Sequence, residues 1–216
     1  MEGYATCDED VLKRVRKKAG RLERIRAEPL ALSRAFVMAL RESVLADRPA
    51  FEDEYGSISA SRGNWTYHFA TKMREVSRCF RLACKFEATG RYDAIVHSLT
   101  GNLPVLVAEW EWDFEDVFGP GKELDKLIRA AKEHGSTADC LLITYHPEDR
   151  SNDLVAKSIK MWRRNTGNLP ATLYLVIVVF SGSSLRQFRS LRVVEIRSKE
   201  TLVWGDLAFS ENEEEE

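Results

Sequence analysis

The sequence predicts one α/β domain with a mixed sheet, and three observations lead to this prediction. Segments with helical and with strand-like apolar patterns occur in the order helix, three strands, helix, strand, helix, strand. The first three strands follow one another without helices, which argues against a fully parallel, doubly wound sheet. Neither GxGxxG nor GxxxxGK[ST] occurs, so the nucleotide-binding motifs of α/β domains are missing. The 216 residues, of which 44% are hydrophobic, suffice for one core.

The first part of the chain, residues 1–50, is expected to form an N-terminal helical extension. It contains a basic segment followed by PLALSRAFVMALRESVLA, which begins at Pro29, and a proline fits the first turn of a helix. Residues 51–64 are rich in Ser, Gly and acidic side chains and predict a loop. From Trp65, apolar residues recur at steps of three and four, which predicts a helix with one buried face that ends near Cys84.

Three predicted strands follow, joined by the turns TGRY and TGNLP: residues 85–89, residues 93–99 and a segment that begins at Val105. Side chains of the third strand, VLVAEWEWD, alternate between two faces. Glu109 and Glu111 therefore point to the same side, while Trp110 and Trp112 point to the other and are expected to be core residues. Carboxylates enter such half-buried strands only with a compensating cation, a set of donors or a metal ion.

The remaining predicted elements alternate between helix and strand. They are a helix at 122–135, a strand at 138–146, a helix at 153–165, a strand at 173–180 and a hairpin at 193–204. We find no internal repeat and no internal domain boundary, so residues 51–210 are the predicted α/β core. The acidic residues 211–216 are expected to form a disordered tail.

Charge and composition restrict the function only weakly. The formal net charge of −2 argues neither for nor against a nucleic-acid partner. Two basic groups are candidate phosphate contacts, although each also fits a solvated helix face: residues 12–26, and Lys160, Arg163 and Arg164.

The four cysteines form no CxxC pair and have no histidine at zinc spacing, so we expect free thiols rather than a zinc site. The longest apolar run, residues 173–180, is too short to span a bilayer. We therefore expect a cytoplasmic protein without a membrane partner.

Three acids in this arrangement resemble a known nuclease family. Asp93 begins the second strand in GRYDAIV, and Glu109 and Glu111 lie in VAEWEWD on the third. A core helix, a three-stranded meander with acids at these places, a helix and a strand resemble the PD-(D/E)XK nuclease superfamily over roughly residues 65–145. The resemblance implies a restriction-endonuclease-like sandwich. Glu111 stands where the family usually has lysine, as in some of its restriction endonucleases, and Tyr92 stands in place of the motif's proline.

Phosphodiester hydrolysis gives these acids a chemical role. The reaction must neutralise negative charge on the phosphorus centre and generate hydroxide near neutral pH, tasks suited to Mg²⁺ or Mn²⁺ with oxygen ligands. Asp93 and Glu109 would hold one ion, with the carbonyl of Trp110 as a further ligand. Glu111 would bind a second ion or act as general base.

Two further roles remain open in the sequence. Glu75, on the preceding helix, resembles by position the acid that many family members contribute to a second metal ion, and Glu54 is its rival. If Glu111 is not the base, a lysine could supply the missing cation, and we include Lys126 among the predicted catalytic residues. The other lysine candidates are Lys122 in the same helix and Lys85 in the first strand.

The sequence therefore favours a metal-dependent nuclease that acts on DNA. The alternative is a catalytically degenerate relative that serves as a nucleic-acid-binding or assembly subunit, because a degenerate site would also lack the motif lysine. A third hypothesis is an interaction protein with a helical arm and purely structural acids. The sequence does not decide the oligomeric state, and a homodimer remains open.

Overall fold

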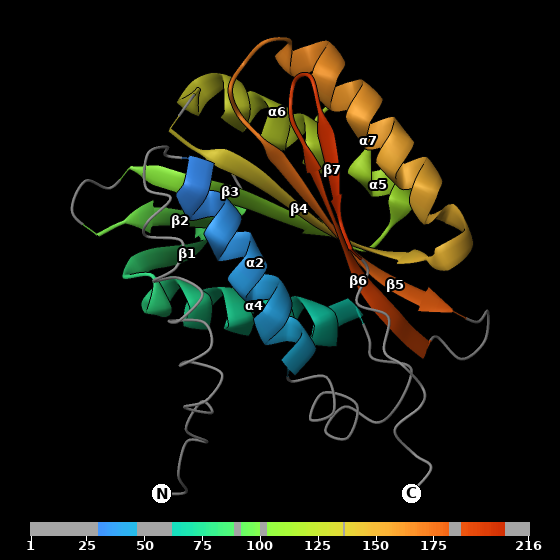
Figure 1. Ribbon diagram of the computed structural model, residues 1–216, viewed down its shortest axis with the longest axis horizontal. Coiled ribbons are helices and arrows are strands. Elements are labelled where there is room, and N and C mark those ends of the chain that lie inside the picture. Colours follow the sequence, from blue (N-terminus) through green and yellow to red (C-terminus); the bar gives the residue numbers. More distant parts are fainter. Residues whose placement is uncertain are drawn as a thin grey trace, which may run out of the picture.

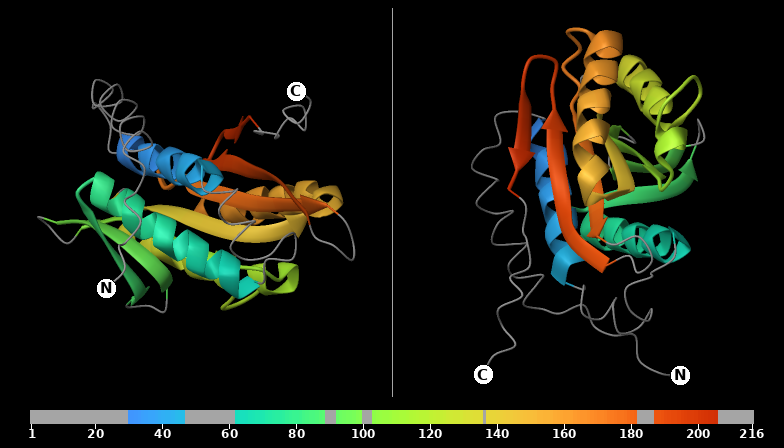
Figure 2. Two further views of the ribbon diagram at one scale, coloured as in Figure 1. Left: turned by 90° about the horizontal axis from the view of Figure 1, so that it is seen from below. Right: turned by 90° about the vertical axis from the view of Figure 1, so that its right-hand side faces the viewer.

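The computed structural model describes most of the chain and has three layers. The described residues are 30–46, 62–88, 92–99, 103–135, 137–181 and 187–205. Within them, a seven-stranded mixed sheet lies between two layers of helices (Figures 1 and 2). The predicted α/β class, with a mixed central sheet flanked by helices, is confirmed.

The strands lie in the sheet in the same order as in the chain. They are β1 (Leu82–Ala88), β2 (Tyr92–Ser98), β3 (Pro104–Glu111), β4 (Asp139–Pro147), β5 (Leu173–Ser181), β6 (Gln187–Ile196) and β7 (Thr201–Trp204). The first three form an antiparallel meander, β3, β4 and β5 are parallel, and β5, β6 and β7 are antiparallel. Parallel neighbours require crossover connections, and a helix supplies each of them.

Helices cover both faces of this sheet. They are α2 (Leu30–Ala46), α4 (Arg62–Cys79), α5 (Phe114–Val117), α6 (Glu123–His134) and α7 (Ser151–Thr166), the last preceded by the 3-10 turn η2 (Glu148–Arg150). Helices α2 and α4 pack on one face, and the crossover helices α6 and α7 pack on the other. The described part of the predicted N-terminal extension is therefore packed against the sheet.

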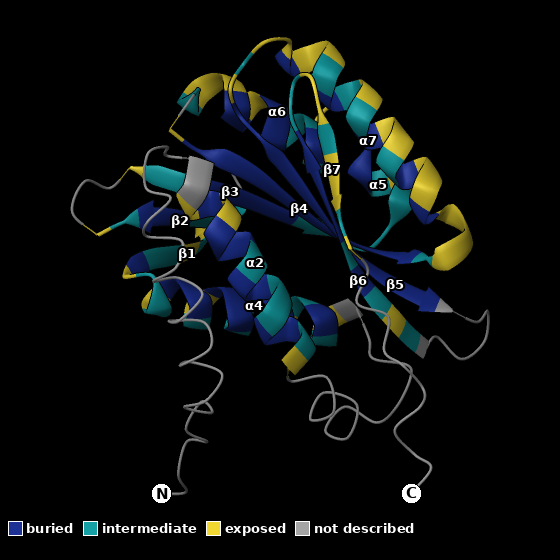
Figure 3. Cartoon of the chain, viewed as in Figure 1, coloured by how far each residue is buried: buried dark blue, intermediate teal, exposed yellow. Residues whose placement is uncertain are grey.

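Helix α4 buries the apolar stripe that its sequence predicts. The stripe is at most 5% exposed and consists of Trp65, Phe69, Met73 and Val76. Alternate strand residues and α2 complete this core, which lies in the dark blue part of Figure 3: Phe36, Leu40, Val96, Leu106 and Ala108. Trp110 and Trp112 pack against the same core, and Trp112 Nε1 donates a hydrogen bond of 2.7 Å to Thr66 Oγ1. Both tryptophans thus lie on the predicted face and pack against the core, although each is only partly buried.

The second core lies between the sheet and helices α6 and α7. Its helical members are Leu124, Leu127, Ile128, Ala131, Leu154 and Trp162, and they pack on Val107, Leu142 and Ile177 of the sheet. Val107 precedes Glu109 by one strand period, so the side chain of Glu109 also points toward α6.

A buried carboxylate on β4 connects α2 to the sheet. Asp139 accepts hydrogen bonds of 2.5 Å from Ser33 Oγ on α2 and of 2.7 Å from the backbone N–H of Thr172. Burial raises the pKa of Asp139, and both hydrogen bonds oppose the rise because they stabilise the charged form. Each oxygen of this carboxylate therefore has a donor of its own.

A second buried carboxylate, Glu195 on β6, also connects α2 to the sheet. Its Oε2 lies 3.1 Å from Arg34 Nε on α2 and accepts a hydrogen bond of 3.1 Å from Trp204 Nε1. Its Oε1 lies 2.5 Å from Arg197 Nη2. We call Asp139 and Glu195, with these donors, the Glu195 centre.

The end of α4 corrects the sequence prediction. The helix ends at Cys79, not near Cys84. Arg81 has a φ of 55°, a left-handed conformation that stops a helix and turns the chain. Strand β1 therefore begins at Leu82, and Ala83, which continues the helical period in the sequence, belongs to a strand.

Two short elements were also not predicted, since α5 and η2 lie between the predicted elements. The basic segment 12–26, the tail 211–216 and Cys7 lie outside the described residues. The other three cysteines are free thiols. No helix in the described part of the chain is long and apolar enough to cross a membrane.

Candidate functional site

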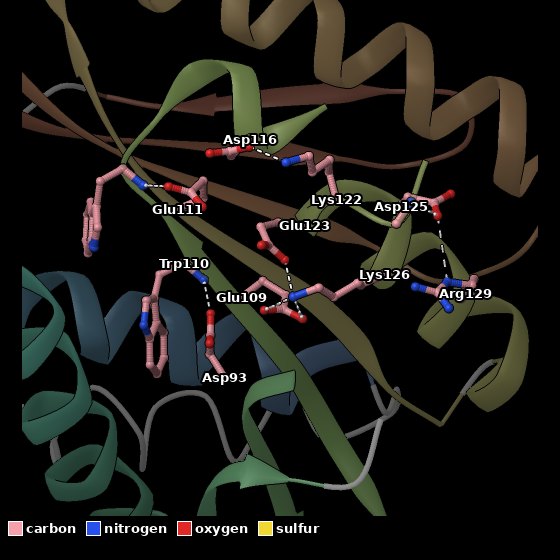
Figure 4. A network of polar contacts seen from close by, with 12 residues as sticks. Asp93, Glu109, Trp110, Glu111, Asp116, Lys122, Glu123, Asp125, Lys126 and Arg129 are labelled. Atoms are coloured by element: carbon pink, nitrogen blue, oxygen red, sulfur yellow. Dashed lines mark hydrogen bonds and ion pairs between the residues drawn. The ribbon is translucent and has the colours of Figure 1, made fainter. Parts of the chain in front are cut away.

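The acids predicted on the second and third strands meet where the pairing of β2 with β3 ends. This pairing extends to Ala94 opposite Ala108. One residue further, Asp93 and Glu109 lie side by side on the two strands (Figure 4). Asp93 Oδ2 accepts a hydrogen bond of 2.8 Å from the backbone N–H of Trp110. This bond holds the Asp93 carboxylate beside Glu109, on the face of the sheet that the alternation in the sequence predicts.

Glu109 is completely buried between β3 and α6. Lys126 of α6 places its Nζ 3.3 Å from each of the two carboxylate oxygens. Burial, and then hydrogen bonding with and repulsion by Asp93, raise the pKa of Glu109 to about 9, although Lys126 opposes the rise. Glu109 is therefore largely protonated at neutral pH unless a further cation comes close.

Glu123, in the first turn of α6, is a fourth acid at this place. It forms an ion pair with Lys126, and the two side chains are only 16% and 20% exposed. Burial raises the pKa of Glu123, Lys126 lowers it, and repulsion by Asp93 and Glu111 raises it further. We call Asp93, Glu109, Glu111 and Glu123 the acid cluster.

Glu123 was not among the predicted site residues, although one feature of the sequence indicated it. Glu123 and Lys126 are three residues apart, which places them on the same side of a helix. Their pairing was thus predictable. The closeness of Glu123 to Asp93 was not, because it depends on how α6 packs on the sheet.

Glu111 lies one strand period beyond Glu109, as predicted, but part of its carboxylate is engaged by the backbone. Its Oε1 accepts hydrogen bonds from the N–H groups of Trp112 at 2.7 Å and Asp113 at 2.8 Å. This oxygen fixes the turn between β3 and α5. Glu111 is therefore less available to a metal ion or a water molecule than Glu109.

The three candidate lysines occupy different places. Lys126 contacts two members of the acid cluster, whereas Lys122 forms an ion pair with Asp116 and is exposed (Figure 4). Lys85 is exposed on β1 at the edge of the sheet. Of the three candidate lysines, Lys126 is thus the one that contacts the acid cluster.

Glu75 is not brought to the acid cluster. It belongs to α4, which covers the opposite face of the sheet, and its Oε2 lies 2.9 Å from Lys72 Nζ. The predicted contribution of Glu75 to the metal site therefore has no support in its position. Its rival, Glu54, lies outside the described residues.

The basic residues of α7 have different surroundings. Arg163 donates hydrogen bonds of 3.2 Å to the carbonyl of Arg197 and of 2.9 Å to Thr201 Oγ1, so it joins α7 to the β6–β7 hairpin. Lys160 and Arg164 are exposed. They remain candidate phosphate contacts.

The acid cluster fits a magnesium ion only in part. In the described portion of the chain, no three His, Cys, Asp or Glu side chains are arranged so that they could hold a metal ion. Mg²⁺, however, usually keeps several waters and binds through one or two carboxylates. Asp93 and Glu109 supply two, and the buried Oε1 of Glu109 accepts no hydrogen bond from any described residue. A hard cation with oxygen ligands suits this pair.

Comparisons with known proteins add no assignment. No family model matches the chain, and neither the characterised proteins nor the solved structures include a significant match.

Proposed function

We propose that this protein is a metal-dependent nuclease of the PD-(D/E)XK type that hydrolyses phosphodiester bonds, with DNA as the favoured substrate. The order of elements supports the proposal. Helix α4, the antiparallel strands β1 to β3, helix α6 on the other face and the parallel strand β4 follow one another as the resemblance implies. A restriction-endonuclease-like fold is part of this proposal.

One observation carries the proposal: Asp93 and Glu109 come together at a buried point with too little positive charge. Asp93 and Glu123 repel Glu109, Glu111 repels Glu123, and in the described part of the chain Lys126 is the cation that contacts two of these acids, Glu109 and Glu123. A purely structural carboxylate would be expected to have its own donors, because an unpaired buried charge is costly. A divalent cation would remove the repulsion and return Glu109 to its charged form.

Each residue then has a defined task. Asp93 and Glu109 would hold Mg²⁺ or Mn²⁺, and Trp110, through its N–H, keeps Asp93 in place. The bound ion would polarise the phosphate and lower the pKa of a water molecule. Lys126 would supply the positive charge that the motif's lysine supplies in the family. Glu111 orients the turn after β3 through its Oε1.

The test is cleavage of linear and circular DNA, and of RNA, by the purified full chain in Mg²⁺, Mn²⁺ or EDTA. We expect divalent-dependent cleavage that Asp93→Asn and Glu109→Gln reduce at least about 10²-fold. Glu75→Gln is the matched control, since it makes the same change in a carboxylate on the opposite face. A parent without cleavage, or variants as active as the control, would contradict the proposal.

A degenerate, nucleic-acid-binding relative is the second candidate, and one observation favours it. Lys126 already contacts both oxygens of Glu109, so the buried acid is partly neutralised without metal. Such a protein would bind DNA or RNA equally well in EDTA and in Mg²⁺ and would cleave neither. Nucleic-acid binding measured by fluorescence anisotropy in both buffers separates the two functions.

A further inference from the structure

Lys126 touches two acids of the cluster, and its two contacts differ. Its Nζ lies 3.3 Å from both Oε1 and Oε2 of Glu109, while its contact with Glu123 Oε2 is closer (Figure 4). Hydrogen bonds between an ammonium and a carboxylate are usually about 2.7–2.9 Å long. The contact with Glu109 is therefore the looser of the two.

We infer that Lys126 takes the place of the metal ion at Glu109 in the metal-free protein, and that Glu123 keeps Lys126 when a divalent cation binds. The inference rests on the proposed function, because it concerns the same metal site. It makes Glu123 a positioning residue, which acts on the metal through Lys126 rather than by coordination.

Glu123 is well placed to hold Lys126 alone. The two residues are three positions apart on α6, so their contact does not depend on the strands. Glu123 also lies in the first turn of the helix, where a negative charge is favoured by the helix dipole. Both side chains are largely buried, so water competes weakly for either partner.

The consequence is competition at Glu109. A metal ion that binds Glu109 must displace the Lys126 ammonium, and the displacement costs less if Lys126 retains Glu123. Removal of Glu123 would leave Lys126 with Glu109 as its remaining partner in the cluster and would strengthen the competition. Removal of Lys126 would eliminate it. The binding of a metal ion to Glu109 and the contact of Lys126 with Glu109 therefore weaken each other.

The test is the affinity of the full chain for Mn²⁺ alone, measured by isothermal titration calorimetry without nucleic acid. We expect Lys126→Met to tighten Mn²⁺ binding and Glu123→Gln to weaken it, each roughly fivefold or more. Asp125→Asn is the matched control: it removes the same charge from α6, but Asp125 faces Arg129, at 3.7 Å, instead of Lys126. Urea denaturation of each variant verifies that it is folded.

The double variant decides between positioning and coordination. In the Lys126→Met background, Glu123→Gln should weaken Mn²⁺ binding no more than Asp125→Asn does, because Glu123 has lost the group through which it acts. An equal loss with and without Lys126 would make Glu123 a metal ligand and overturn the inference. Weaker binding by Lys126→Met would overturn it as well, even if Glu123→Gln does not fold. Absence of Mn²⁺ binding in the parent and in Lys126→Met would instead contradict the proposed function.

Discussion

Glu109 and Glu195 are both completely buried carboxylates of the same sheet, but their surroundings differ. Glu195 has two guanidinium groups and an indole N–H at its oxygens. Glu109 has one ammonium, which it shares with Glu123, and it is repelled by Asp93. The two carboxylates are equally buried, but their negative charges are not equally compensated by neighbouring donors. Glu195 is therefore suited to joining elements of the fold, and Glu109 is suited to binding a cation.

The donors of the two acids also come from different sources. At the Glu195 centre, Arg34 is on α2 and Trp204 is on β7, so the contacts of Glu195 hold three elements together. At Glu109 the lysine comes from the helix directly above the strand, and the neighbouring residues add further acids. The first arrangement stabilises the fold. The second leaves Asp93 and Glu109 to repel each other, and this repulsion opposes the stabilising contact with Lys126.

The same substitution at the two positions should have opposite effects on stability. Glu195→Gln places an amide against Arg34 and Arg197 and should lower the free energy of unfolding by about 2–3 kcal/mol. This is less than the roughly 3–5 kcal/mol expected for breaking a fully buried ion pair, because both arginines are partly exposed. Glu109→Gln should keep or raise this free energy at pH 7, because an amide resembles the protonated acid. Urea denaturation in EDTA measures both values. Equal losses would show that Glu109 is as structural as Glu195.

The pH dependence of stability should also identify Glu109. Its pKa is raised from 4.5 to about 9 in the folded protein. The stabilisation that follows from this shift is complete below pH about 4.5 and is lost as the pH rises through about 9. The parent should therefore lose stability relative to Glu109→Gln in this window, by at most about 1.4 kcal/mol per pH unit. The free energies of unfolding of both proteins, measured in EDTA at several pH values, test this prediction. The same pH dependence in the two proteins would contradict it.

Substitution of Glu111 should have the smallest effect, and it tests whether this side chain mainly binds the backbone of the turn after β3. Glu111→Gln should lower the free energy of unfolding by about 1 kcal/mol, because Oε1 accepts two backbone hydrogen bonds that are stronger with a charged acceptor. Any metal-dependent cleavage should fall less than about tenfold, since a general base is worth more. A loss of 10²-fold or more, measured under the same conditions as for Glu109→Gln, would return Glu111 to the role of general base.

Much of the fold was predictable because it depends on local periodicity. The two-residue alternation of VLVAEWEWD placed Glu109 opposite the tryptophans, and the three- and four-residue steps from Trp65 identified the buried face of α4. These two features need no knowledge of distant contacts. That Asp93 and Glu109 share one side depends in addition on the antiparallel pairing of β2 with β3.

The missed features depend on helix packing or on turn geometry. The left-handed Arg81 ends α4 although the apolar period continues to Ala83. Glu123 comes close to Asp93 only because α6 packs on β3. Glu75 lies on the opposite side of the sheet from these acids because α4 packs on the other face. Glu111 uses its own backbone as a partner, which strand alternation does not reveal. Each of these outcomes follows from packing or from turn geometry that the pattern of residue types leaves open.

The most direct test of the central claim, that the acid cluster and not the Glu195 centre binds a divalent cation, is thermal unfolding of three proteins with and without Mn²⁺ at pH 8. Mn²⁺ at about a hundred times its Kd would stabilise a binding protein by about 2.7 kcal/mol. We predict a clear rise in Tm for the parent and for Glu195→Gln, and none for Glu109→Gln. An unchanged Tm of the parent, or an equal rise in Glu109→Gln, would contradict the claim.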